Sequence, residues 1–293
     1  MIQAVLIEGL IYGIMVLGVF ITFRILDFPD LTVDGSFPLG AAVMAICLVS
    51  GVDPIVGTGL AIVSGIMAGM VTALLHTVLK IPNLLAGILT MTMLYSINLR
   101  IMGNKSNISL IKSENIVKDA ENFLPGLPDG IAVLIIFLVI VLVIKLLLDL
   151  FFRTDMGLAL GALGSNEQMI ISQGMNPNYL KIIGVSLSNG LVALSGAFAA
   201  QYMGYADVNL GQGIVVAGLA SVMIGEFLIK SNKISALTAR VILGSIAYKA
   251  VMYAGRKYGY HIGLTPNDLK LITGVLIVFL IALSGIKKRR KNA

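Results

Sequence analysis

Charged residues are scarce in this sequence. Asp, Glu, Lys and Arg together make up 12% of its 293 residues, whereas 57% are hydrophobic. A water-soluble domain has about a quarter of its residues charged, because charged side chains cover its surface. The shortage excludes a soluble fold and predicts that lipid covers most of the chain. We therefore expect an all-α integral membrane protein built as a polytopic helical bundle.

Residues for metal binding and catalysis are also few. The single cysteine, Cys47, lies inside an apolar run, and the two histidines, His76 and His261, are far apart in the chain. A disulfide framework and a cysteine-based metal site are excluded, and the histidines predict no metal cluster. HExxH, a serine nucleophile elbow and a close carboxylate pair beside a histidine are all missing. The sequence therefore offers no catalytic and no metal-binding residues. The residues that hydrolysis or intramembrane proteolysis would need are missing.

Two sequence signals of other protein classes are absent. The chain has no GxxxxGK[ST] phosphate loop, so any ATP and its Mg²⁺ must be bound by another subunit, and we expect no cofactor in this chain. It has no Lys or Arg before Arg24, whereas a signal peptide begins with positive residues. We expect residues 2–23 to form a retained membrane span.

The net charge of +6 does not indicate nucleic-acid binding. Five positive residues form one block, Lys287 to Lys291, directly after the last apolar segment, and no aromatic residues are interleaved with them. Such a block beside a span is typical of a cytoplasmic anchor, and it is compatible with contact to anionic lipid.

Eight or nine apolar segments are long enough to cross a bilayer or to enter it, since a full crossing takes about 20 residues. The second and seventh are short and glycine-rich, so each is compatible with a broken or re-entrant helix. We find no linker that divides the chain and expect one membrane domain, 1–293. The segments are 2–23, 36–50, 54–79, 83–102, 130–150, 180–202, 213–229, 234–254 and 269–286.

The positive-inside rule orients this bundle. With the basic tail in the cytoplasm and nine crossings, the N-terminus lies outside, and Arg24 and Lys80 lie inside. The polar segment 103–129 is then an external loop, and 153–178 is cytoplasmic. Segment 153–178 has leucines at roughly helical spacing, which predicts one or two short helices along the membrane surface. Such helices either form a surface that a soluble ATPase binds or only cover the end of the bundle.

Polar residues inside membrane segments are costly and face protein, water or a solute. We list as candidate pathway residues Asp34, Ser36, Tyr95, Asn98, Gln201, Tyr202, Asp207, Asn209 and Glu226. Hydrogen bonding between helices is the alternative for each of them. Asp30–Val33 and Asp207–Leu210 also precede similar glycine-rich segments, on the inner and the outer side respectively, which is compatible with inverted repeats around a pathway.

Two stretches resemble a known family. The run from Gly157 to Glu226, beginning GLALGALGSNEQMIISQGMNPN, is similar to permease subunits of bacterial ABC importers of the branched-chain amino acid and ribose class. The run PDLTVDGSFPLGAAV, from Pro29 to Val43, resembles the narrower tryptophan/tyrosine-type transport permeases. Met156 and the Gly225–Glu226 pair depart from the branched-chain pattern and favour this narrower subgroup. Because of these departures, the solutes of the broader class do not identify the solute of this chain.

The resemblance implies a type II importer-like fold and an assembly in the bacterial inner membrane. Two permease copies, expected to be a homodimer, would act with cytoplasmic ABC ATPase subunits and an extracytoplasmic substrate-binding protein, either lipid-anchored or periplasmic. The solute would be a small molecule, an aromatic-type amino acid by resemblance, moved by alternating access. The resemblance places the ATPase-coupling element at Gly157 to Gln168, with Gly157, Leu158, Ala159, Leu160, Gly161, Ala162, Gly164, Asn166 and Glu167.

Two other classes of function remain open at the level of the residues. The chain could be a self-contained secondary transporter in which Asp34, Asp207 or Glu226 coordinates a proton or sodium ion. It could also be a membrane enzyme or an assembly factor. A measurement of solute uptake distinguishes the three classes. ATP-dependent uptake with a partner subunit indicates the ABC permease, ion-driven uptake by the chain alone indicates the secondary transporter, and no uptake indicates the third class.

Overall fold

The chain folds into a bundle of helices with one small sheet. The computed structural model describes residues 2–111, 113, 116–117, 130–230, 233–259, 271, 274–275 and 278. In chain order the elements are α1 (Ile2–Phe20), η1 (Ile21–Ile25, a π-helical continuation of α1), α2 (Val33–Val49), α3 (Pro54–Thr77), α4 (Asn83–Ile101), β1 (Asn107–Ser109), α6 (Ile131–Phe151), α7 (Asp155–Ser165), α8 (Glu167–Ser172), α9 (Pro177–Met203), β2 (Tyr205–Asp207), α10 (Ile214–Leu228) and α11 (Ile234–Gly259).

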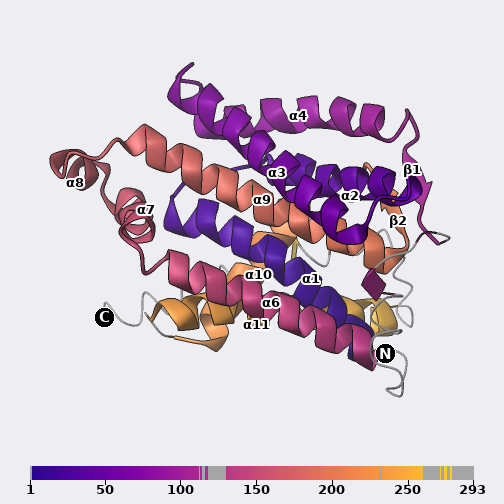
Figure 1. Cartoon of the computed structure of the whole chain (residues 1–293). Helices are drawn as coiled ribbons and strands as arrows, with labels where there is room; N and C mark the ends of the chain where they lie inside the picture. The colour runs from indigo at the N-terminus through magenta and orange to yellow at the C-terminus, as the bar shows by residue number, and fades with distance from the viewer. Residues whose placement is uncertain are drawn as a thin grey trace.

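The long helices run side by side between two different ends (Figure 1). At one end β1 and β2 pair antiparallel, with Ile108 opposite Ala206, and we call this the sheet end. At the other end α7 and α8 project from the bundle, and we call this the α7–α8 end. The expected short helices within 153–178 are therefore present.

Within the part of the chain that the structure describes, six helices are long and apolar enough to cross a membrane, namely α1 with η1, α3, α4, α6, α9 and α11. The apolar helices α2 and α10 have 17 and 15 residues, fewer than the about 20 that a full crossing takes. The prediction of eight or nine apolar segments, two of them short, is confirmed for the first eight. Most of the ninth, 269–286, the basic tail and much of loop 103–129 lie outside the described residues.

Helix α1 lies at the centre of the bundle, and serine hydroxyls from its neighbours bind its backbone. Ser188 Oγ of α9 donates to the Gly18 carbonyl at 2.7 Å, and Ser195 Oγ donates to the Ile11 carbonyl at 2.7 Å. Lipid tails provide no hydrophobic drive between helices, so close packing and such hydrogen bonds hold them together. Helices α1 and α9 are the two most buried spans, and these hydrogen bonds join them at the centre of the bundle.

Helices α2 and α9 approach so closely that glycine is required between them. A Cβ on Gly40 would lie 1.9 Å from the Ala193 carbonyl oxygen, and a Cβ on Gly196 would lie 1.9 Å from the Phe37 carbonyl oxygen. Both obstacles are backbone atoms and cannot rotate away. We call this contact the α2–α9 seam.

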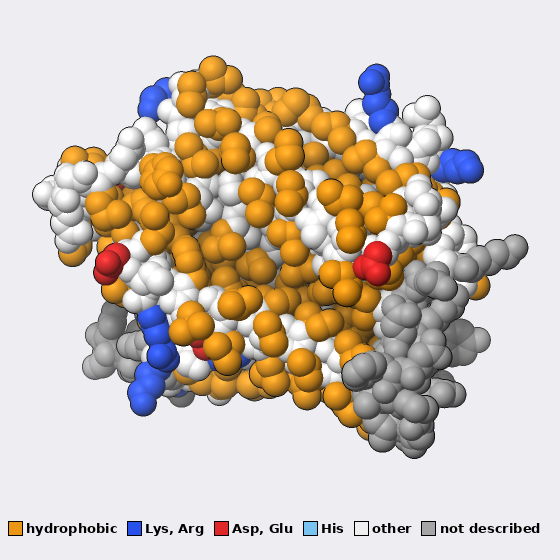
Figure 2. All heavy atoms as spheres, in the orientation of Figure 1, with side chains coloured by type: hydrophobic (Ala, Val, Ile, Leu, Met, Phe, Trp, Pro, Cys, Tyr) orange, Lys and Arg blue, Asp and Glu red, His pale blue; other side chains and the backbone are white. Residues whose placement is uncertain are grey.

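The surface agrees with a membrane-embedded protein. Figure 2 shows hydrophobic side chains over the middle of one face, with most Lys, Arg, Asp and Glu toward its two ends. Leu142 and Leu146 of α6, for example, are 50% and 59% exposed. Apolar side chains gain nothing from exposure to water, so a band of this extent is expected to face lipid.

Candidate transport cavity and coupling helices

A cavity of about 460 Å³ opens beside α2 and α4 near the sheet end. It brings together three residues that the sequence analysis listed, Asp34, Tyr95 and Asn98. The full lining is Asp34, Gly35, Pro38, Met91, Thr92, Tyr95, Asn98, Val208, Gln212 and Gly213. Its size falls within the range of about 300–1,000 Å³ that small-molecule sites occupy.

The Asp34 side chain connects the first turn of α2 to the start of α10. Its carboxylate accepts hydrogen bonds from the backbone N–H groups of Gly213 and Val215, both at 2.9 Å. The N-terminus of a helix carries unpaired N–H groups and the positive end of the helix dipole, so it attracts a carboxylate. Pro38, one turn further along α2, has no N–H to donate to the Asp34 carbonyl, which therefore lacks its intrahelical partner.

Asn98 is a fully buried residue in the cavity wall, and its amide is only partly satisfied. The Nδ2 group donates to the Gly35 carbonyl at 3.2 Å. This contact fixes which way the amide points, because a carbonyl accepts a hydrogen bond only from the NH₂ group. The Oδ1 atom is buried and has no hydrogen-bond partner. An unpaired buried acceptor costs about 1–3 kcal/mol, which is unusual in a native protein.

Asp207 and Asn209 lie behind this wall and hold one of its residues. The Asp207 carboxylate accepts from Asn107 Nδ2 at 3.2 Å and from the Asn209 backbone N–H at 2.7 Å. Asn209 Oδ1 in turn accepts from Gln212 Nε2 at 3.0 Å. These two predicted residues therefore support Gln212, which lines the cavity and which the sequence analysis missed.

Ser36 belongs to a polar cluster inside the protein and does not line the cavity. Its hydroxyl donates to Asn189 Oδ1 at 2.7 Å, and Asn189 Nδ2 donates to the Asp30 carboxylate at 2.7 Å. Asp30 also accepts from the Thr32 backbone N–H, two residues further on, just as Asp207 does from Asn209. The two similar sequence stretches thus share one local turn, although this turn alone does not test the inverted repeats.

Gln201 and Tyr202 are packing residues in this structure. Gln201 is buried, and its Oε1 accepts from the Ile116 backbone N–H at 3.0 Å. The Tyr202 ring packs edge-on against Phe137, with 6.4 Å between the ring centroids. Neither residue is among those that line the cavity.

Glu226 lies near the end of α10, far from the start of that helix at the cavity. Its carboxylate pairs with Arg24 of η1 at 2.8 Å and with Arg240 of α11 at 3.2 Å. This cluster connects three elements near the α7–α8 end. It is therefore a contact between helices, and it does not contribute to the cavity.

The expected coupling segment forms two helices, and each begins after a residue that caps its N-terminus. Thr154 Oγ1 accepts from the Gly157 backbone N–H at 3.3 Å and caps α7, and Asn166 Oδ1 accepts from the Met169 backbone N–H at 3.3 Å and caps α8. Ser, Thr, Asp and Asn are the preferred residues at this position. Glu167 forms an ion pair with Lys181 of α9 at 3.0 Å.

The predicted coupling residues divide into a packed set and an exposed set. Gly157, Ala159 and Leu160 are buried; Gly161, Ala162 and Gly164 are half-buried; Leu158, Asn166 and Glu167 are exposed. Gly164 rests on η1, where a Cβ would lie 1.9 Å from the Ile25 carbonyl oxygen. The packed set thus fixes α7 against the end of α1, and only the exposed set is available to a partner.

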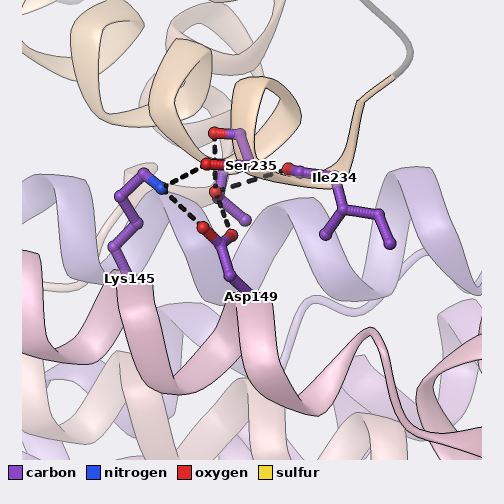
Figure 3. A network of polar contacts seen from close by, with 5 residues as sticks. Lys145, Asp149, Ile234 and Ser235 are labelled. Atoms are coloured by element: carbon purple, nitrogen blue, oxygen red, sulfur yellow. Dashed lines mark hydrogen bonds and ion pairs between the residues drawn. The ribbon is translucent and has the colours of Figure 1, made fainter.

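A polar network braces α6, the helix that leads into α7, against α11 (Figure 3). Lys145 Nζ lies 2.6 Å from the Asp149 carboxylate and 3.1 Å from Ser235 Oγ. Thr238 Oγ1 donates to Asp149 Oδ1 at 2.5 Å. This network was not predicted from the sequence, although a lysine and an aspartate four residues apart in an apolar helix signal an internal pair.

Within the described residues there is no group of three His, Cys, Asp or Glu side chains that could hold a metal ion. His76 Nδ1 lies 2.8 Å from the Ile81 carbonyl, and its ring packs edge-on against Phe28. This histidine therefore has a structural role. His261 lies outside the described residues.

Comparison with known proteins identifies the family. Residues 1–282 match the family described as the permease component of the branched-chain amino acid transport system. The chain belongs to this permease family. A permease of this kind is a multi-pass membrane subunit of a transport system, and the resemblance found in the sequence is thereby confirmed.

Individual relatives cover nearly the whole permease. The tyrosine transport system permease protein of Clostridioides difficile (strain R20291) is 44% identical over 292 residues, which are 99% of this chain and 94% of that protein. The ribose import permease protein RbsC of Bacillus subtilis (strain 168) is 26% identical over 220 residues, 74% of this chain and 66% of that protein. Among solved structures, PsaBC from Streptococcus pneumoniae in complex with Fab has a TM-score of 0.55 at 18% identity, covering 95% of this chain and 90% of that one. This structure supports the fold alone.

Proposed function

We propose that this permease carries an aromatic amino acid across the bacterial inner membrane, driven by a separate ATPase that binds α7 and α8. The observation that carries the proposal is the placement of two features at opposite ends of one bundle. A cavity lined by both polar and apolar side chains lies near the sheet end, and the short helices α7 and α8, which carry exposed apolar side chains, lie at the opposite end.

The exposed apolar residues on α7 and α8 favour a protein partner. Leu158, Met169 and Ile171 are 56%, 50% and 49% exposed, on helices that stand apart from the long spans. Exposed apolar side chains beside polar ones are typical of a protein interface. The chain has no phosphate loop, so this partner would supply ATP binding with Mg²⁺ and hydrolysis.

The orientation follows from the same helices. If an ATPase binds α7 and α8, their end is cytoplasmic, and the sheet end faces the binding protein outside the membrane. Arg24, Arg153 and Lys181 lie at the α7–α8 end, as the positive-inside rule expects. The basic tail then belongs to the cytoplasm and the N-terminus to the outside.

The cargo is proposed from the relatives and the cavity together. The 44% identical relative is named for tyrosine transport, and the cavity combines polar groups with the side chains of Met91, Tyr95 and Val208. This mixture suits a small amphipathic solute. The resemblance to this permease class implies two permease copies in the assembly, so we propose a homodimer.

Alternating access would connect the two ends. A movement of α7 reaches α1 through the Gly164 contact with η1, and it reaches α10 through the Arg24–Glu226 pair. The start of α10 is bound to Asp34 in the cavity wall. ATP-driven movement therefore has a physical route to the cavity, because the ATPase would bind α7 and α8 differently in its two states.

Uptake of labelled tyrosine into proteoliposomes tests this function. We expect ATP-dependent uptake when the permease is assembled with its ATPase and binding protein. Uptake by the permease alone under an ion gradient would instead show a secondary transporter, and no uptake in either case would contradict transport of this amino acid.

A substitution on the exposed face of α7 tests the coupling. We expect Leu158→Asp to reduce uptake at least tenfold and to leave the amount of folded permease unchanged, because this side chain makes few contacts within the bundle. Ser172→Ala on α8 is the matched control, since its hydroxyl only binds the Gln168 carbonyl of its own helix. Normal uptake and ATP hydrolysis with Leu158→Asp would place the ATPase elsewhere.

A further inference from the structure

The described lining of the cavity beside α2 and α4 carries negative charge. Among the ten lining residues that the structure describes, Asp34 is the single acidic residue, and none is Lys, Arg or His. The start of α10 offsets part of this negative charge through two N–H groups and the helix dipole. A dipole end carries about half a unit charge, so a net negative potential remains in a low-dielectric environment. The cavity therefore prefers a cationic group to an anionic one.

Asn98, which lines the same cavity, carries a second acceptor. Its Oδ1 is buried and unpaired, while its Nδ2 is held by the carbonyl of Gly35, the residue that directly follows Asp34. The amide cannot turn to satisfy Oδ1 without losing the Gly35 contact. A buried acceptor of this kind is expected to have a hydrogen-bond donor in the working protein.

An apolar surface completes the lining. Met91, Pro38 and Val208 also line the cavity, together with Tyr95, which is 47% exposed. A ligand that fits all of these groups has a positively charged donor at one end and an apolar or aromatic body at the other. A primary amine with an aromatic side chain meets this description.

We propose that Asn98 Oδ1 and the Asp34 carboxylate form a subsite for the ammonium group of the transported amino acid. The aromatic side chain lies along Met91, Tyr95 and Val208. This subsite rests on the proposed function, which assigns an amino acid to the cavity. It deepens that function by naming the part of the substrate that the permease itself recognises.

Cysteine protection with three ligands tests the subsite. In a Cys47→Ala background, Thr92→Cys places one reactive thiol in the cavity wall, and the permease–ATPase complex in membrane vesicles is labelled with a maleimide. The ligands are tyrosine, tyramine, which lacks the carboxylate, and 3-(4-hydroxyphenyl)propionate, which lacks the ammonium group. We expect tyrosine and tyramine to slow labelling at least fivefold and the propionate less than 1.5-fold. Equal protection by the propionate, or none by tyramine, overturns the proposal.

Substitution of Asn98 gives a second test. Asn98→Leu should abolish protection by tyramine, and Asn98→Asp, which keeps an acceptor oxygen, should retain it. Thr90→Val is the matched control, because Thr90 is a buried polar residue of the same helix whose hydroxyl donates to the Ala86 carbonyl outside the cavity lining. If Asn98→Leu does not fold, the comparison of the three ligands in the protein that keeps Asn98 still tests the subsite. Full protection in folded Asn98→Leu rules the subsite out.

The two proposals can fail separately. Absence of ATP-driven tyrosine uptake, with tyramine still protecting the thiol, contradicts the assigned cargo and supports an amine site. Normal tyrosine uptake, with the propionate protecting as well as tyramine, contradicts the subsite and supports the transport function.

Discussion

The two short helices α2 and α10 meet their neighbours through different balances of contact. Helix α2 lies against α9 along the α2–α9 seam, where backbone meets backbone at Gly40 and Gly196, and one side-chain bond, from Ser36 to Asn189, joins the same two helices. Helix α10 has a similar glycine contact with α11, where a Cβ on Gly225 would lie 2.2 Å from the Arg240 carbonyl oxygen, but it meets α2 and η1 through polar groups, namely the Asp34 carboxylate and the Arg24–Glu226 pair.

The difference shows where the bundle can change shape. A glycine seam has no freedom, since any shift between the helices makes backbone atoms collide or leaves a void. Ion pairs and hydrogen bonds can lengthen, exchange partners or bind water at a modest cost in free energy. In this permease such contacts join α10 to α2 and to η1, so movement of α10 against these two elements is expected between two access states.

The seam gives the largest expected effect. Gly40→Ala would place a methyl group 1.9 Å from the Ala193 carbonyl oxygen, so backbone must move. Overpacking costs about 1–3 kcal/mol, and here we expect the upper end or more. The amount of monodisperse permease after size-exclusion chromatography should fall sharply. Gly59→Ala on α3 is the control, because its Cβ would meet nothing within 4 Å. Equal yields from both variants would remove the basis of the comparison.

The charge cluster at the end of α10 should give an intermediate effect. Glu226→Gln leaves Arg24 and Arg240 facing each other without the carboxylate between them. Because the Arg240 side chain is only 12% exposed, we expect a loss of about 1–3 kcal/mol in stability, less than for a fully buried pair. Thermal unfolding measures the stability, and uptake per folded permease should drop more steeply than Tm. A large Tm loss with normal uptake per folded protein would make the cluster structural only.

The exposed pair on α8 should give the smallest effect. The Glu167 side chain is 47% exposed in its contact with Lys181, and such pairs contribute less than about 1 kcal/mol. We expect Glu167→Gln to leave Tm within the error of the measurement. A clear drop in ATP hydrolysis stimulated by the binding protein, with Tm unchanged, would assign Glu167 to the ATPase contact. A clear drop in Tm would show that this pair resembles the Glu226 cluster.

Much of the fold could be predicted from the sequence, because apolar runs of helical length must be helices in lipid. The segment expected at 83–102 is α4 at 83–101, and the segment expected at 54–79 is α3 at 54–77. Helix α2 begins at Val33 and not at residue 36, because the Asp30 side chain binds the Thr32 N–H and starts the helix early.

The site was harder to predict. A polar residue in an apolar segment is visibly costly in free energy, but the sequence does not show which group it binds. Ser36 and Asp34 are two residues apart on α2, yet Ser36 binds Asn189 inside the protein and Asp34 lines the cavity. Gln212 gave no sequence signal, because it lies in a polar stretch where glutamine is unremarkable. Which of these residues meets a solute depends on how α4, α9 and the 208–213 segment come together.

Pro38 divides α2 into two parts with different attachments. The first turn, which carries Asp34, is joined to the rest of the helix by one hydrogen bond fewer than a regular helix would have. The remainder stays on α9 along the seam. The proline therefore marks the point at which the first turn would tilt with α10 relative to the rest of α2, a movement that also requires the Ser36–Asn189 bond to α9 to lengthen or exchange its partner. A few degrees of swing there would widen or narrow the cavity without unpacking the core.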